Sequence, residues 1–158
     1  MISVTKEVSY ALLEVSSSAF AEETMIPSKY TCEGINVNPP IQIGKIPSNT
    51  KSLAVIVDDP DAPVNTWTHW IAWNIPVTHL IKENTSVGTA GMNDFQHCRY
   101  EGPCPFSGKH RYHFKVFALD TVLSLPIGSR INSLEKSMSG HIIGFGETTG
   151  IYQKKNND

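Results

Sequence analysis

The chain has 158 residues, of which 18% are charged and 40% are hydrophobic, as in an ordinary globular protein. Its net charge of −2, from 13 basic and 15 acidic side chains, lacks the basic excess that nucleic-acid binding usually requires. No apolar stretch is long enough for a transmembrane helix, and residues 1–20 lack the basic start and apolar run of a signal peptide. We therefore expect a single cytoplasmic domain over residues 1–158, although a mature secreted chain with an added Met would look similar.

Ten prolines and eleven glycines divide the chain into short segments, which favours strands over long helices. In chain order, strands are expected at 41–43, 52–57, 67–75, 111–119 and 148–152. Short helical turns are expected near Leu80 and Lys82, and Ile131, Leu134 and Met138 recur at the spacing of a helix over 131–139. The pattern predicts a mainly β domain with antiparallel, Greek-key connections and one or two small peripheral helices.

Three carboxylates and two prolines follow the expected strand 52–57, in the segment Asp58-Asp59-Pro60-Asp61-Ala62-Pro63. Because proline fixes φ, this segment would hold its carboxylates at the end of the strand. A calcium site is disfavoured, since the glycine spacing of a calcium loop is missing. The segment is either part of a binding site or simply a stiff acidic turn.

The next expected strand contains a histidine, His69, among mainly apolar residues. His69 shares strand parity with Ile71, Trp73 and Ile75, so we expect it to point into the apolar interior. A histidine in such a place must find a hydrogen-bond partner or remain neutral. Taken alone, His69 is interpreted as a core histidine whose hydrogen bonds are satisfied inside the protein.

A loop rich in glycine and proline, residues 100–109, leads directly into the expected strand 111–119. Its glycines would let a ligand approach the backbone closely and leave N–H donors free. His110 falls in phase with Tyr112 and Phe114, which places it at the mouth of the apolar face. The loop alone is equally consistent with an ordinary connection between strands.

These three segments occur in order, together with further motifs. The motifs are IPSKYTCEG (26–34), NPP (38–40), KSLAVIVDDPDAP (51–63), GHI (140–142) and GIY (150–152). In this combination the chain resembles the phosphatidylethanolamine-binding family, in its bacterial and archaeal Raf-kinase-inhibitor-like branch, over nearly its whole length. The resemblance implies a β-sandwich of two antiparallel sheets with small flanking helices, and a shallow cavity for phosphate-like groups at one end.

Carried onto this sequence, the resemblance implies a ligand pocket formed by Asp59, Pro63, His69, Gly102, Pro103, His110 and Tyr112. Asp61 and Arg111 resemble a pair that stabilises the loop rather than one that contacts the ligand. The sequence departs from the usual pattern of the branch at Phe106, where a second proline usually follows Cys-Pro. It departs again over 93–99, where a small, glycine-containing stretch is usual. The rim of the pocket is therefore expected to differ from that of relatives.

The resemblance favours a binding or regulatory protein without a cofactor over an enzyme. The expected ligand is a phospholipid headgroup or another phosphorylated or anionic molecule, and the family name suggests inhibition of a kinase or a peptidase. The alternative is a metal-dependent hydrolase in which Asp59, His69 and His110 bind zinc. HExxH and Gly-x-Ser-x-Gly motifs are missing, which disfavours an enzyme. A third interpretation is a scaffolding domain with a vestigial pocket, and prokaryotic relatives suggest a homodimer.

Three cysteines, Cys32, Cys98 and Cys104, fit a reduced compartment better than a disulfide framework, so three free thiols are expected. The alternative is a bridge between Cys32 and Cys104, because both lie in motifs that resemble those of the family. Cys98 lies in the divergent stretch and is expected to be unpaired in either case.

Overall fold

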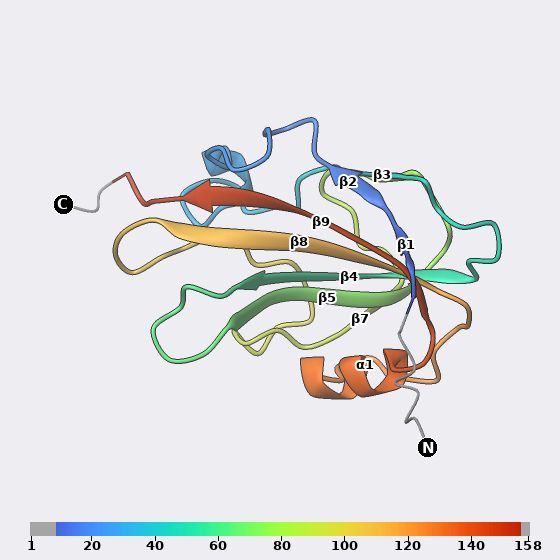
Figure 1. Cartoon of the computed structure of the whole chain (residues 1–158). Helices are drawn as coiled ribbons and strands as arrows, with labels where there is room; N and C mark the ends of the chain where they lie inside the picture. Colours follow the sequence, from blue (N-terminus) through green and yellow to red (C-terminus); the bar gives the residue numbers. More distant parts are fainter. Residues whose placement is uncertain (1–8, 156–158) are drawn as a thin grey trace, which may run out of the picture.

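The computed structural model describes residues 9–155, which form a mainly β structure of two sheets with one α-helix and one 3-10 helix (Figure 1). The larger sheet has six strands in the order β1 (Ala11–Leu12), β9 (Ile142–Tyr152), β8 (His110–Leu119), β4 (Ser52–Asp59), β5 (Trp67–Ile75) and β7 (Thr89–Ala90). The smaller sheet has three strands in the order β2 (Glu14–Ser16), β3 (Ile41–Gly44) and β6 (Leu80–Ile81). The helices are η1 (Ser28–Tyr30) and α1 (Ile131–Met138). The predicted two-sheet, mainly β architecture is confirmed.

β4 lies near the centre of the larger sheet and is buried along its whole length. Val55 and Val57 belong to the core between the two sheets, together with Ile43 of β3. Ile56 faces the other way and packs with Leu134 of α1. Because both faces of β4 are covered, its sequence is a continuous apolar run rather than an alternating pattern. The smaller sheet and α1 thus lie on opposite faces of the larger sheet (Figure 1).

β8 follows the alternation predicted for residues 111–119. Tyr112 and Phe114 are fully buried in the core between the sheets, whereas His113 and Lys115 lie on the other face and remain partly exposed. The strand pairs antiparallel with both β4 and β9, and His113 lies opposite Asp58 of β4. The start of β8 therefore lies beside the end of β4.

A β-bulge in β5 changes the direction of His69. Val57 of β4 pairs with Trp70, and the next residue, Asp58, pairs with Thr68, so His69 is an extra residue without a partner on β4. After the bulge, Ile71 packs on the α1 side of the sheet. The expectation that His69 shares a face with Ile71 and Trp73 was wrong, because a period of two does not continue through a bulge. Ile75, beyond a second register shift between Leu53 and Val55 of β4, does lie in the core between the sheets, on the face of His69.

Two further differences from the sequence interpretation concern pairing. The helical turns expected near Leu80 and Lys82 were wrong: Leu80–Ile81 is strand β6, in which Ile81 pairs with Ile41 of β3 and is 1% exposed. Pairing with β3 and burial of Ile81 outweigh the weak preference of this segment for a helical turn. In addition, the short β1 runs parallel to β9, although the other strand pairs are antiparallel.

No helix within residues 9–155 has the length and hydropathy needed to cross a membrane.

β9 is longer than the strand predicted over 148–152, and two of its glycines permit close crossing by the N-terminal segment. A Cβ atom at Gly146 would lie 2.3 Å from the backbone oxygen of Leu13, and one at Gly150 would lie 2.4 Å from Ile26 Cγ1. Glycine in a strand often marks such a close approach of another segment. The glycines that obscured the strand in the sequence are therefore accommodated by tertiary packing.

Candidate functional site

The ends of three neighbouring strands lie together at one end of the larger sheet, at the left of Figure 1. β4 ends at Asp59, β5 begins at Trp67 and β8 begins at His110. β4 lies between the other two strands, and Asp59 pairs directly with Trp67. The adjacency assumed for the strands expected over 52–57, 67–75 and 111–119 is therefore present in the fold. It brings the acidic loop after β4 beside the loop that precedes β8.

Asp59 and His110 form a nearly buried pair at this edge. Asp59 Oδ2 lies 2.6 Å from His110 Nδ1, and the two side chains are 5% and 13% exposed. Because a carboxylate only accepts hydrogen bonds, Nδ1 carries the proton and donates it, which leaves Nε2 for a ligand. Asp59 Oδ1 accepts a hydrogen bond from the backbone N–H of Asp61 at 2.8 Å, so the turn itself fixes the carboxylate.

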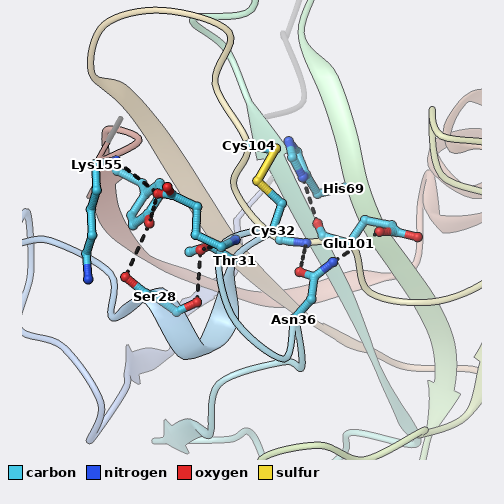
Figure 2. The surroundings of a disulfide bond; sticks show 11 residues. Ser28, Thr31, Cys32, Asn36, His69, Glu101, Cys104 and Lys155 are labelled. Atoms are coloured by element: carbon cyan, nitrogen blue, oxygen red, sulfur yellow. Dashed lines mark hydrogen bonds between the residues drawn. A yellow bond between two sulfur atoms is a disulfide. The ribbon is translucent and has the colours of Figure 1, made fainter. Parts of the chain in front are cut away.

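His69 is held from the other side by the backbone. Its Nδ1 donates to the carbonyl oxygen of Glu101 at 2.7 Å, a contact drawn in Figure 2. His69 is 3% exposed, and this burial lowers the pKa of the imidazole, partly opposed by the Glu101 carbonyl. The ring is therefore neutral at neutral pH, and its Nε2 is an acceptor. The predicted core histidine is half right: one ring nitrogen is satisfied, and the other is not bonded within residues 9–155.

Tyr112 lies between the two imidazoles. Its ring packs edge-on against His69 at a centroid distance of 5.3 Å and stacks near His110 at 6.4 Å. The hydroxyl oxygen is buried and has no hydrogen-bond partner within residues 9–155. Burial raises the pKa of Tyr112 far above its ordinary value, so the hydroxyl keeps its proton and is a donor. A buried hydroxyl without a partner is costly, and a ligand can satisfy it.

These groups line one cavity of ≈ 180 Å³. The lining residues are Asp59, Ala62, Pro63, Trp67, His69, Phe95, Cys104, Pro105, Phe106, His110 and Tyr112. Five of the seven residues implied by the resemblance are among them: Asp59, Pro63, His69, His110 and Tyr112. The cavity is smaller than a typical pocket for drug-sized ligands, and its size suits a small group such as phosphate.

Gly102 and Pro103 do not line this cavity. The N–H of Gly102 donates to Asn36 Oδ1 at 2.8 Å, and a Cβ at this position would lie 1.9 Å from the backbone oxygen of Tyr30. The carbonyl oxygen of Pro103 accepts from the N–H of Cys32 at 3.1 Å. The glycine therefore allows two loops to meet, and the free N–H donor expected from it is already used inside the protein.

A disulfide joins these two loops beside the cavity. Cys32 and Cys104 are bonded, with their Cα atoms 5.4 Å apart, and Figure 2 shows the bridge next to His69. The expectation of three free thiols was wrong, because the fold brings together two cysteines that are 72 residues apart in the chain. Cys98 is an exposed free thiol, as predicted. Cys104 lines the cavity, so the bridge fixes part of its wall.

Asp61 and Arg111 form a bidentate pair at the outer side of the acidic loop. Arg111 Nη2 donates to Asp61 Oδ1 at 2.9 Å, and Arg111 Nε donates to Oδ2 at 3.0 Å. The backbone N–H of Arg111 adds a third bond to Oδ2 at 2.9 Å. These hydrogen bonds lower the pKa of Asp61 to about 2. The pair ties the loop after β4 to the start of β8, beside the cavity but outside its lining.

The sequence interpretation missed the apolar rim of the cavity. Trp67, Phe95 and Phe106 all line it, and they are 38%, 37% and 90% exposed. Phe95 packs edge-on against both Trp67 and His69 at 5.5 and 5.3 Å. Phe95 and Phe106 lie in the two places where the sequence departs from the pattern it resembles, and that departure was the available signal. Large apolar side chains at a cavity mouth are typical of a surface that meets a ligand or a partner.

Within residues 9–155, no three His, Cys, Asp or Glu side chains are arranged as ligands of one metal ion. In the triad considered for zinc, His110 Nδ1 is engaged by Asp59, and His69 Nδ1 is engaged by Glu101. The carboxylate of Asp59 is thus committed to His110, whereas the Nε2 atoms of both histidines remain open to a ligand.

The fold and the site define a class of protein: a β-sandwich with a small cavity at the end of the larger sheet where three adjacent strands meet. The chain belongs to the phosphatidylethanolamine-binding protein family, whose family model matches residues 16–153. The resemblance drawn from the sequence motifs is therefore confirmed.

Curated relatives and solved structures agree with this assignment. A UPF0098 protein of Pyrococcus abyssi is 52% identical over 150 residues, which cover 88% of this chain and 84% of the relative. A UPF0098 protein of Pyrococcus horikoshii is 50% identical over 150 residues, with 88% and 76% covered. The crystal structure of a phosphatidylethanolamine-binding protein homologue from Chlamydia trachomatis matches with a TM-score of 0.88 at 38% identity, covering 93% of this chain and all of that one. Escherichia coli YbcL, described as a member of the mammalian family, matches with a TM-score of 0.84 at 30% identity, covering 90% and 99%.

Proposed function

We propose that the cavity binds the phosphate-type group of a phospholipid headgroup or another phosphorylated ligand, and that the protein acts by binding rather than by catalysis. The observation that carries this proposal is a set of three polar atoms in one cavity that have no hydrogen-bond partner within residues 9–155: Nε2 of His69, Nε2 of His110 and the hydroxyl of Tyr112. Such atoms are satisfied by a small ligand with several oxygens, which is what a phosphate group offers.

The three atoms differ in whether they donate a hydrogen bond to the ligand or accept one from it. The Tyr112 hydroxyl is a donor, and His110, oriented by Asp59, becomes a charge-assisted donor when its Nε2 is protonated. The neutral His69 offers an acceptor. A singly protonated phosphomonoester, such as phosphoethanolamine, has oxygens for the two donors and an O–H for the acceptor, whereas the phosphodiester of an intact phospholipid would satisfy the two donors only. The carboxylate of Asp59 in the cavity wall also favours this lower charge over a dianion.

The apolar rim extends the proposal to the rest of the ligand. Trp67, Phe95 and Phe106 would contact the substituent that the phosphate carries, whether a lipid or a phosphorylated side chain. Inhibition of a kinase or a peptidase is proposed from the family resemblance, as is the homodimer, whereas the cytoplasmic location is proposed from the sequence alone. The disulfide is of a kind found mostly in oxidising compartments, so the location is best tested directly by fractionating the native cell.

The test is calorimetric titration with inorganic phosphate and with phosphoethanolamine. We expect His110→Ala to weaken binding by roughly 1–3 kcal/mol, the usual cost of losing a hydrogen bond to a charged group. His113→Ala is the matched control, because His113 lies on the same strand but on the opposite face of the sheet.

Equal affinities of the wild type and the His110 variant would contradict the proposal. Hydrolysis of a phosphoester that is lost in the same variant, together with stoichiometric zinc in the purified protein, would instead support the metal-dependent hydrolase with Asp59, His69 and His110. Failure of every small anion to bind the folded protein would favour the scaffolding domain.

A further inference from the structure

A polar groove lies behind the anion pocket, on the face of the larger sheet that carries α1. Two adjoining cavities of ≈ 450 and ≈ 220 Å³ share Asp58, Thr66 and Lys115 and together form this groove. The remaining lining residues are Ile56, Pro60, Asn65, Thr68, His113, Phe117, Ile131, Asn132, Glu135 and Glu147. The combined space is within the range of small-ligand sites.

The groove is separate from the anion pocket, although the same strand ends build both. In three pairs of consecutive residues, one member lines the groove and the other lines the pocket. The groove residues are Asp58, Thr68 and His113, and their neighbours in the pocket are Asp59, His69 and Tyr112. Successive side chains of a strand point to opposite faces, so each pair reaches both sites. No residue lines both the groove and the pocket.

The groove presents polar atoms that the described protein leaves unpaired. The Asp58 side chain is 10% exposed; its Oδ2 accepts from Lys115 Nζ at 2.9 Å, while its Oδ1 has no partner within residues 9–155. Thr68 is 4% exposed, and its hydroxyl is likewise unbonded in this part of the chain. His113 Nδ1 is buried and lies 3.6 Å from Glu147 Oε2, too far for a hydrogen bond. Among these atoms only His113 Nδ1 is fully buried without a partner, which is unusual in a folded protein. Asp58 Oδ1 and the Thr68 hydroxyl are unbonded but not fully enclosed, so a donor that enters the groove can bond to them.

The charged side chains that line the groove indicate that its ligand is positively charged. Three carboxylates, of Asp58, Glu135 and Glu147, face one ammonium, of Lys115. The apolar part of the lining consists of Ile56, Phe117 and Ile131. A negative groove with apolar side chains along it complements a cationic group on an apolar stem.

We propose that this groove binds an arginine side chain of a peptide or protein partner. The guanidinium would donate to Asp58 Oδ1 and the Thr68 hydroxyl, with Glu147 adding a second negative charge. Its aliphatic stem would lie along Ile56 and Phe117. A guanidinium suits these acceptors better than an ammonium, because its planar fork donates in several directions at once.

The test compares two peptides with blocked termini, Gly-Arg-Gly and Gly-citrulline-Gly, by amide NMR titration of the whole protein. Citrulline keeps the shape of arginine and removes its charge. We expect the arginine peptide to shift the amide signals of Thr68 and Lys115 and to bind about tenfold more tightly than the citrulline peptide, as is usual for hydrogen bonds to charged groups. Equal binding of the two peptides would overturn the proposal.

Variants locate the site. Asp58→Asn and Glu147→Gln should each weaken the arginine peptide at least several-fold, whereas Asp120→Asn removes an exposed carboxylate outside the groove and should change nothing. Glu147→Gln keeps the test decisive if Asp58→Asn fails to fold, because Glu147 is 37% exposed. His110→Ala should leave peptide binding unchanged. Unaltered affinity in the Glu147 variant, or loss of peptide binding in the His110 variant, would refute the groove as the site.

Discussion

Asp58 and Asp59 are consecutive residues of β4, but their carboxylates lie on opposite faces of the larger sheet and contact different partners. Asp58 pairs with Lys115 Nζ at 2.9 Å in the groove, and Asp59 pairs with His110 Nδ1 at 2.6 Å in the pocket. Because the two carboxylates line different cavities, replacing either one removes a group from one face of the sheet and not from the other. This separation makes the two proposed sites independently testable.

The ligand's own proton is the subject of the first prediction. If neutral His69 accepts a P–OH group, methyl phosphate should bind and methyl sulfate, which has no proton to donate, should bind about tenfold or more weakly. Methyl phosphate should bind more tightly as the pH falls from about 8 to about 6, because the singly protonated form of a phosphomonoester accumulates as the pH approaches its second pKa of about 6. Calorimetry at the two pH values measures both effects. Equal affinities for methyl phosphate and methyl sulfate would show that His69 does not accept a hydrogen bond from the ligand.

Tyr112→Phe should separate binding from stability. It removes the donor, so phosphate affinity should fall about tenfold. It also removes a buried hydroxyl without a partner, so the free energy of unfolding should be unchanged or slightly higher. Thermal unfolding and calorimetry on the same samples give both values. A large loss of stability would mean that the hydroxyl is paired inside the folded protein.

The disulfide should contribute to both stability and pocket shape. The two cysteines are 72 residues apart, and the chain-entropy model gives about 4 kcal/mol for a loop of that length. A Cys32→Ser, Cys104→Ser variant should therefore unfold at clearly lower denaturant concentration and bind phosphate more weakly, because Cys104 lines the cavity. Cys98→Ser is the control and should match the wild type, since Cys98 is exposed and free. A disulfide-free variant with wild-type stability and affinity would contradict both roles.

Gly102→Ala should be more damaging than Gly108→Ala. The added methyl at Gly102 meets the backbone oxygen of Tyr30 at 1.9 Å, so the loops must separate, at a cost of about 1–3 kcal/mol or more for overpacking. At Gly108 the added methyl has nothing within 4 Å, and only the φ of 72° opposes it, at about 1–2 kcal/mol. Urea unfolding of both variants checks the order. A reversed order would show that the loop containing Gly102 moves easily.

Asp61→Asn should lower stability in a pH-dependent way. The folded-state pKa of Asp61 is about 2, below its usual value, so the ionised form is the one stabilised by Arg111. That stabilisation is present above the unfolded-state pKa of about 4 and disappears as the pH falls to about 2. The difference in Tm between the wild type and the variant should therefore be constant at neutral pH and vanish over that interval. A difference that stays at its neutral-pH size when the pH has fallen through about 2 would assign the effect to packing rather than charge.

Much of the fold was predictable because its strongest signals are local. The apolar run that ends at Asp58 and the alternation from Arg111 to Leu119 identify two central strands within one or two residues of their observed bounds. The short β6 and the long β9 were not predictable in this way. Ile81 becomes a strand residue only because β3 lies beside it, and β9 tolerates its glycines only because another segment fills the space.

The sequence by itself determined which residues are available to the pocket: an acidic turn held by prolines, a histidine in a strand, and a histidine at the start of another. Only the tertiary structure decided how they are used. The bulge at His69 turns that residue away from the face its parity predicted, and the contact with Tyr30 makes Gly102 a structural residue. The approach of Cys32 to Cys104 is likewise a product of the assembled loops. The physical reason is common to all three: alternation and turn preference act over a few neighbouring residues, whereas bulges, close backbone crossings and disulfides depend on chain segments that meet only in the folded protein.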